Sequence, residues 1–149
     1  MALTDPPATP PSPLPVPEPD ETTRFYWDGA ADGRLLAQRC RSCEAFQFPP
    51  DVSCVHCQSG DLDHAELSGR GTVYTYALVE RPLHAGFVDA VPYVVALVEL
   101  EEQPGLRLMA NIIDGPQAPL SCGTPVEVTY ERRGDVTLPQ FRVAAGAAS

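Results

Sequence analysis

The sequence contains no lysine, and its ten basic residues are all arginine. Twenty acidic residues outnumber them, so the formal net charge is −10. A surface of this sign repels a phosphate backbone at long range, which argues against nucleic acid as a partner. The sequence also has no apolar run of about 18 residues, the length that a membrane-spanning helix requires.

The first residues lack the basic stretch and the apolar stretch that together mark a secretory signal. We therefore expect a cytoplasmic protein that does not enter a membrane. A nucleophile elbow, a phosphate-binding loop, a dinucleotide-binding glycine motif and a paired-histidine metal motif are all absent. No active site is visible in the sequence, and we expect no catalysis by this chain alone.

What the sequence does contain is two Cys-x-x-Cys motifs separated by ten residues. In a reducing compartment such cysteines stay as thiols, so they are more readily explained as metal ligands than as disulfide partners. Four thiolates close a tetrahedral site and leave no open position for catalysis, so we expect structural zinc. Iron, which uses the same ligands, and a redox dithiol are the alternatives. The predicted ligands are Cys40, Cys43, Cys54 and Cys57.

The beginning of the chain is rich in proline. Residues 1–21 hold eight of the 17 prolines, which predicts a disordered, extended tail. A helical segment is expected over residues 22–36, capped by Thr22 or Thr23 and divided by glycines into two short helices or one kinked helix.

The rest of the chain predicts β structure. Residues 37–66 form a ribbon in which a short strand between the two cysteine turns carries Phe46 and Phe48 on one face. Residues 67–144 alternate between apolar and polar side chains in five short stretches, without a long helix among them. Such strands close into a small Greek-key barrel of OB-fold type. The expected strands are 71–79, 93–100, 106–113, 125–130 and 138–143, and residues 145–149 form a flexible tail.

The longest connection between these strands, residues 81–92, is the best candidate for a binding loop. The clustered aromatic residues at the start of the helical segment cannot all share one helical face, so they either cover the metal module or contact a partner. The candidate contact residues are Phe25, Trp27, Phe46, Phe48, Arg81, His84 and Phe87.

Several motifs occur in a fixed order over about residues 22–143: Phe25-Tyr-Trp-Asp-Gly, the first cysteine pair, Phe48-Pro-Pro, the second cysteine pair and Gly69-Arg-Gly-Thr-Val-Tyr74. In this order the chain resembles the DUF35 family. The resemblance implies a mainly β protein with an N-terminal helical segment and a rubredoxin-like zinc ribbon, followed by a five-stranded OB-fold barrel. One departure is Glu44, because the family usually has glycine after the first cysteine pair.

The resemblance also implies a function. Members of this family are accessory subunits of acyl-CoA metabolism that pair with a thiolase-like protein in a hetero-oligomer, and acyl-CoA would be reached through the complex. The chain looks most like the subunit of actinobacterial steroid side-chain aldolases, whose thiolase-like partner cleaves a carbon–carbon bond by retro-aldol chemistry. Association with a MaoC-like hydratase or an acyltransferase is the alternative. Positive charge for CoA phosphates would come from Arg81, Arg107, Arg132 and Arg133.

Overall fold

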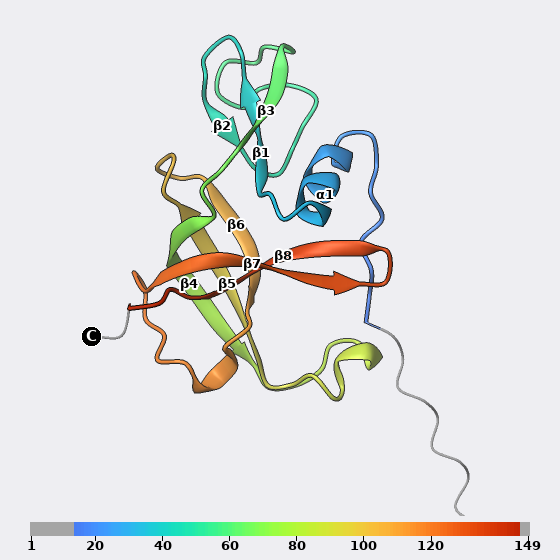
Figure 1. The fold of residues 1–149 in the computed structure, drawn as a ribbon, viewed down its shortest axis with the longest axis vertical. Helices are drawn as coiled ribbons and strands as arrows, with labels where there is room; N and C mark the ends of the chain where they lie inside the picture. The colour runs from blue at the N-terminus through green and yellow to red at the C-terminus, as the bar shows by residue number, and fades with distance from the viewer. Residues whose placement is uncertain (1–13, 147–149) are drawn as a thin grey trace, which may run out of the picture.

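The computed structural model describes residues 14–146. A three-stranded ribbon stands above a closed five-stranded barrel, and one helix packs beside both (Figure 1). This architecture confirms the predicted fold class. Residues 1–13 of the predicted tail and residues 147–149 lie outside the described part of the chain. Residues 14–20 contain no helix or strand, but they are held against the barrel, because Arg133 donates a hydrogen bond to the carbonyl oxygen of Pro15 at 3.2 Å.

The helix α1 covers only Arg24–Ala31, so the prediction of helix up to residue 36 is wrong. Gly33 adopts a φ of +73°, a left-handed conformation that ends helices, and the chain then enters a strand. Thr23 occupies the N-cap position as expected. Its hydroxyl, however, donates to the carboxylate of Asp20 at 2.9 Å rather than accepting from a helix N–H.

The ribbon consists of β1 (Leu36–Cys40), β2 (Phe46–Gln47) and β3 (Leu62–Glu66). The central strand β1 pairs antiparallel with both neighbours. The cysteine turns belong to the ribbon, which forms the upper part of Figure 1.

The barrel consists of β4 (Arg70–Val79), β5 (Tyr93–Leu100), β6 (Arg107–Ile112), β7 (Pro125–Arg133) and β8 (Val136–Val143). Its strand order is β4-β5-β6-β8-β7, with β6 and β8 parallel and the other pairs antiparallel. A Cβ on Gly71 would collide with the carbonyl oxygen of Glu99. Glycine is therefore required at the point where β4 passes close to the backbone of β5. Two short 3-10 helices, η1 (Ala85–Phe87) and η2 (Gly115–Gln117), lie in the connections.

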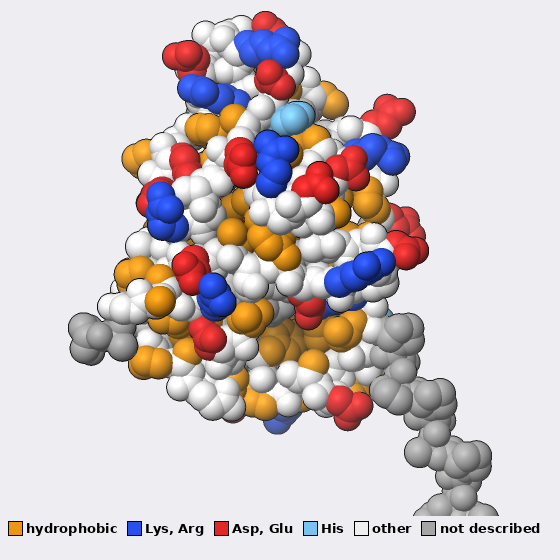
Figure 2. Space-filling model, in the orientation of Figure 1, with side chains coloured by type: hydrophobic (Ala, Val, Ile, Leu, Met, Phe, Trp, Pro, Cys, Tyr) orange, Lys and Arg blue, Asp and Glu red, His pale blue; other side chains and the backbone are white. Residues whose placement is uncertain are grey.

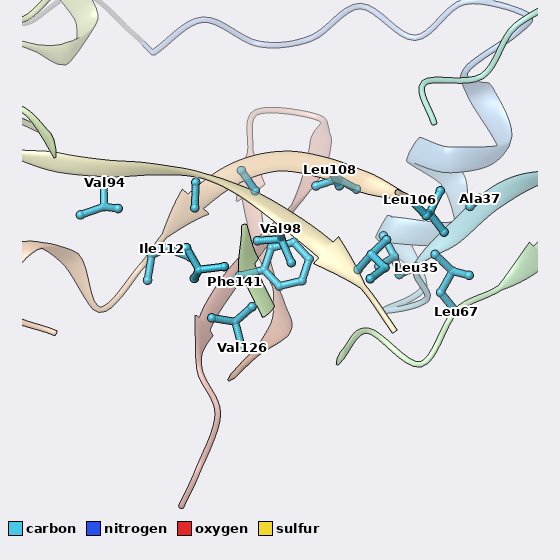
Figure 3. Packing of buried hydrophobic residues seen from close by; sticks show 14 of the residues in the cluster. Leu35, Ala37, Leu67, Val94, Val98, Leu106, Leu108, Ile112, Val126 and Phe141 are labelled. Atoms are coloured by element: carbon cyan, nitrogen blue, oxygen red, sulfur yellow. The ribbon is translucent and has the colours of Figure 1, made fainter. Parts of the chain in front are cut away.

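The hydrophobic core runs without interruption from the barrel into the base of the ribbon (Figure 3). Phe141 and Val98 are completely buried at its centre. Leu35 and Leu67, which precede and follow the ribbon, join the same cluster, as does Tyr26 of α1. The ribbon therefore has no separate core, and its folding depends on the barrel as well as on its cysteines.

Among residues 14–146, no helix has the length and apolar character needed to cross a membrane. On the face shown in Figure 2, acidic and basic side chains are interspersed, with apolar surface between them.

Candidate functional site

The four predicted ligands meet at the tip of the ribbon. The sulfur atoms of Cys40 and Cys57 are 3.6 Å apart, as are those of Cys43 and Cys54, and all four lie within 4.8 Å of one another. A tetrahedron with Zn–S bonds of about 2.3 Å has sulfur–sulfur edges of about 3.8 Å. The arrangement therefore fits one tetrahedral metal ion bound by four thiolates.

The two cysteine turns have the same backbone geometry. The N–H of Glu44 donates to the carbonyl oxygen of Cys40 at 2.9 Å, and the N–H of Gln58 donates to that of Cys54 at 2.8 Å. Both residues have a positive φ, 64° for Glu44 and 65° for Gln58. Glu44 thus adopts the left-handed conformation for which glycine is usually selected, and the turn closes at the cost of backbone strain.

The two halves of the metal centre differ in exposure and in thiol acidity. Cys40 and Cys54 are buried, whereas Cys43 and Cys57 reach the surface. The backbone N–H of Cys43, supported by the neighbouring Cys57 thiol, lowers the pKa of Cys40 to about 6. A thiol with a lowered pKa is readily deprotonated, as metal binding requires.

Two buried glutamines hold the second cysteine turn in place. Gln47 of β2 donates to Gln38 of β1 at 2.6 Å and accepts from the N–H of Val55 at 2.8 Å. Gln38 in turn donates to the carbonyl oxygen of Asp51 at 2.8 Å and accepts from the N–H of Asp51 at 2.9 Å. These contacts fix the loop that leads to Cys54. These contacts were not predicted, because the sequence indicates them only by a polar residue at an inward position of each strand.

The predicted contact residues lie in several separate places. Trp27 and Phe87 line one hollow of about 280 Å³, together with Tyr93. Phe25 instead faces the ribbon, where its ring stacks on that of His64 with the centroids 4.8 Å apart.

The other aromatic candidates are partly used within the fold. Phe46 and Phe48 are half-buried against the core. Phe48 contacts the ring of Tyr26 at a centroid distance of 5.2 Å. Arg81 and His84 are exposed, and the Nδ1 of His84 accepts the N–H of Gly86 at 2.9 Å, which starts the helix η1.

The arginines considered for CoA phosphates divide into two groups. Arg107 is paired with Glu99 at 2.9 Å, and Arg133 with Glu131 at 2.7 Å. Within residues 14–146, Arg81 and Arg132 form no ion pair. Those two side chains therefore keep an uncompensated charge.

Comparison with known protein families matches both parts of the chain. Residues 27–63 match the ChsH2 rubredoxin-like zinc ribbon domain, and residues 64–131 match the ChsH2 C-terminal OB-fold domain. The chain is 33% identical over 113 residues to a DUF35 domain-containing scaffold protein of Methanothermobacter thermautotrophicus. The aligned region covers 75% of this chain and 83% of that protein. The chain belongs to the DUF35 family, as the sequence motifs indicate.

Other relatives are parts of acyl-CoA enzymes. A probable enoyl-CoA hydratase alpha subunit of Thermomonospora curvata is 39% identical over 131 residues, 87% of this chain but only 40% of that protein. The benzoylsuccinyl-CoA thiolase subunit BbsA of Geobacter metallireducens is 31% identical over 96 residues, 64% of this chain and 60% of that protein. Among solved structures, a chain of the Ltp2-ChsH2(DUF35) aldolase has a TM-score of 0.76 at 37% identity, covering 87% of this chain and all of that one.

Proposed function

We propose that this chain is a non-catalytic, zinc-binding subunit that docks on a thiolase-like acyl-CoA enzyme and supports its activity. The observation that carries the proposal is the match to the full length of a chain in the Ltp2-ChsH2(DUF35) aldolase. The similarity to a benzoylsuccinyl-CoA thiolase subunit favours a thiolase-like partner.

The chemistry of the described residues is consistent with a supporting role. Within residues 14–146, the four cysteines are the only group of three or more potential metal ligands that come together. Cys40, Cys43, Cys54 and Cys57 would occupy all positions of a tetrahedral zinc ion, so the metal would stabilise the ribbon rather than bind substrate. Iron, which uses the same four thiolates, is the alternative ion and would add redox chemistry.

The reaction of the complex would be cleavage of a carbon–carbon bond in an acyl-CoA by retro-aldol chemistry. The similarity to an aldolase subunit supports this reaction class. A steroid side chain attached to CoA is the proposed substrate, as the resemblance to steroid side-chain aldolases implies. The thiolase-like partner would carry the catalytic residues, while this chain would stabilise the partner and shape its acyl-CoA entrance.

A second candidate function is that of an acyl-CoA-binding module associated with a hydratase. The 39% identity to a probable enoyl-CoA hydratase alpha subunit favours it. In that case the isolated chain would bind acyl-CoA, with Arg81 and Arg132 as the charges available to its phosphates.

Co-expression tests the main proposal. An affinity tag on the thiolase-like protein from the same genome should retain this chain through size-exclusion chromatography at a fixed ratio. Calorimetry of the isolated chain with an acyl-CoA separates the two candidates, because the main proposal predicts no binding without the partner. Separate elution of the two proteins would contradict it.

A further inference from the structure

The hollow that contains Trp27 and Phe87 lies on the outer face of β5 and β6. In an OB-fold barrel the second and third strands, with the loops that flank them, form the ligand-binding face. In this barrel those strands are β5 and β6. The connection before β5 contributes Phe87, and the opposite wall comes from Arg133, the last residue of β7, and from β8. The helix α1 adds a further wall through Trp27.

The outer face of β5 is apolar where water-facing positions are usually polar. Along this strand, buried residues alternate with half-buried ones, and three of the half-buried residues are Tyr93, Val95 and Leu97. Leu97 pairs with Met109 on β6, whose side chain is 69% exposed. A solvated sheet face alternates apolar-in with polar-out, so this face departs from that pattern. Exposed apolar surface bordering a hollow is typical of an interaction site.

Two arginines on this face are each paired with a carboxylate. Arg133 at the hollow is paired with Glu131 at 2.7 Å. At the other border, Arg107 is paired with Glu99 and lies 3.7 Å from the ring centroid of Tyr74. The lining of the hollow therefore carries no unpaired charge, on a chain of net charge −10. It offers no uncompensated cation to a phosphate, which argues against CoA or nucleic acid as the occupant.

We infer that this face is where the thiolase-like partner docks, with an apolar side chain of the partner entering the hollow. The inference depends on the proposed function and adds the surface that serves it. Tryptophan, tyrosine, phenylalanine, methionine and arginine are the residues enriched at the centre of protein interfaces, and all five line the hollow. An apolar face without unpaired charge suits an apolar side chain of a partner, whereas the acidic remainder of the chain disfavours unspecific contacts.

A charge placed in the middle of this face tests the inference. Met109→Glu should weaken binding of the co-expressed thiolase-like protein at least tenfold, measured as Kd by biolayer interferometry. Met109→Leu keeps the apolar side chain and should bind within twofold of the unmodified chain. Val52→Glu is the matched control, because Val52 is 79% exposed on the ribbon and gains the same charge away from the face.

Metal content and thermal unfolding show whether each variant is folded. Phe87→Ala removes one wall of the hollow and is a second, independent variant. If Met109→Glu and Phe87→Ala both bind as tightly as Val52→Glu, the docking face is wrong while the proposed function stands. If the unmodified chain does not bind the partner at all, the proposed function itself is wrong and the inference fails with it.

Discussion

Gln103, in the turn between β5 and β6, forms two hydrogen bonds with the backbone of Phe46 in the ribbon. The N–H of Phe46 donates to Gln103 Oε1 at 2.8 Å, and Gln103 Nε2 donates to the carbonyl oxygen of Phe46 at 2.9 Å. The two residues are 57 positions apart in the chain. The barrel thus pairs with β2 through a side chain, and this contact holds the ribbon at a fixed orientation.

Removing this contact should loosen the ribbon. Gln103→Ala leaves the partly buried N–H of Phe46 without its partner, and we expect the free energy of unfolding to fall by about 1–2 kcal/mol. The carbonyl oxygen of Phe46 still accepts a hydrogen bond from His56 Nε2 at 3.2 Å, which limits the loss of stability. Urea unfolding measures the change, and hydrogen exchange should show faster exchange at the Phe46 amide. Gln117→Ala, at an exposed glutamine in η2, is the control and should leave both unchanged.

Loss of one ligand should release the metal. Cys57→Ser removes one of four thiolates, and since metal binding contributes about 10–16 kcal/mol to the folding of small zinc modules, the ribbon should unfold. We expect the zinc content, measured by mass spectrometry of the purified chain, to fall from one ion per chain to nearly none. Cys122→Ser should keep the ion, because Cys122 lies outside the four-sulfur cluster. Equal metal content in the two variants would refute the ligand assignment.

Relief of backbone strain should stabilise the first cysteine turn. Glu44 has a φ of 64°, which costs a non-glycine residue about 1–2 kcal/mol, while glycine adds some entropy to the unfolded chain. Glu44→Gly should therefore raise the free energy of unfolding by about 0.5–1 kcal/mol. Glu44→Ala removes the same charge but retains Cβ, so it should give no gain. A gain of the same size in both variants would point to charge instead of backbone conformation.

Stability should decline at alkaline pH because of Tyr26. Burial, with a smaller contribution from Tyr130, raises the pKa of Tyr26 well above its usual value. Unfolding returns the phenol to a pKa of about 10, so its stabilising effect is complete below pH 10 and is lost as the pH rises towards the folded-state pKa.

Lysine, which would titrate in the same range, is absent, so the comparison with a Tyr26 variant has to separate this group only from other tyrosines such as Tyr130, whose pKa burial also raises. Between pH 10 and 11.5 the free energy of unfolding should fall by up to about 1.4 kcal/mol per pH unit for this group. Tyr26→Phe preserves the ring and should flatten the profile, as followed by urea unfolding at each pH. Parallel profiles for the two proteins would exclude Tyr26 as the cause.

The barrel could be predicted from the sequence because its strands alternate regularly between buried and outward residues. The predicted strand 93–100 has the same bounds as β5. The strand β7 continues to Arg133, beyond the predicted end at residue 130, because its last residues are charged and gave no apolar pattern. The metal centre could be predicted as well, because ligand spacing within each tight turn is a local property of the chain.

What the sequence did not indicate depends on contacts between distant segments. The helical segment was predicted to end at residue 36, where β1 begins, because Leu35 and Leu36 fit the apolar face of a helix. No alternation marks the start of the strand, since residues 35–38 are all buried. They are buried on both sides, by the helix, the barrel and the ribbon itself. The hollow joins Trp27, Phe87 and Met109 from three separate elements. No local pattern relates these positions, so only the tertiary structure places them together.

The most direct test of the proposed role is an acyl-CoA cleavage assay with this chain alone, the thiolase-like protein alone and the two combined. A steroid side-chain hydroxyacyl-CoA serves as substrate, and release of the shortened acyl-CoA is followed by chromatography. We expect no turnover by this chain alone and full activity only when both proteins are present at their complex ratio. Turnover of the thioester by this chain alone would contradict a non-catalytic role.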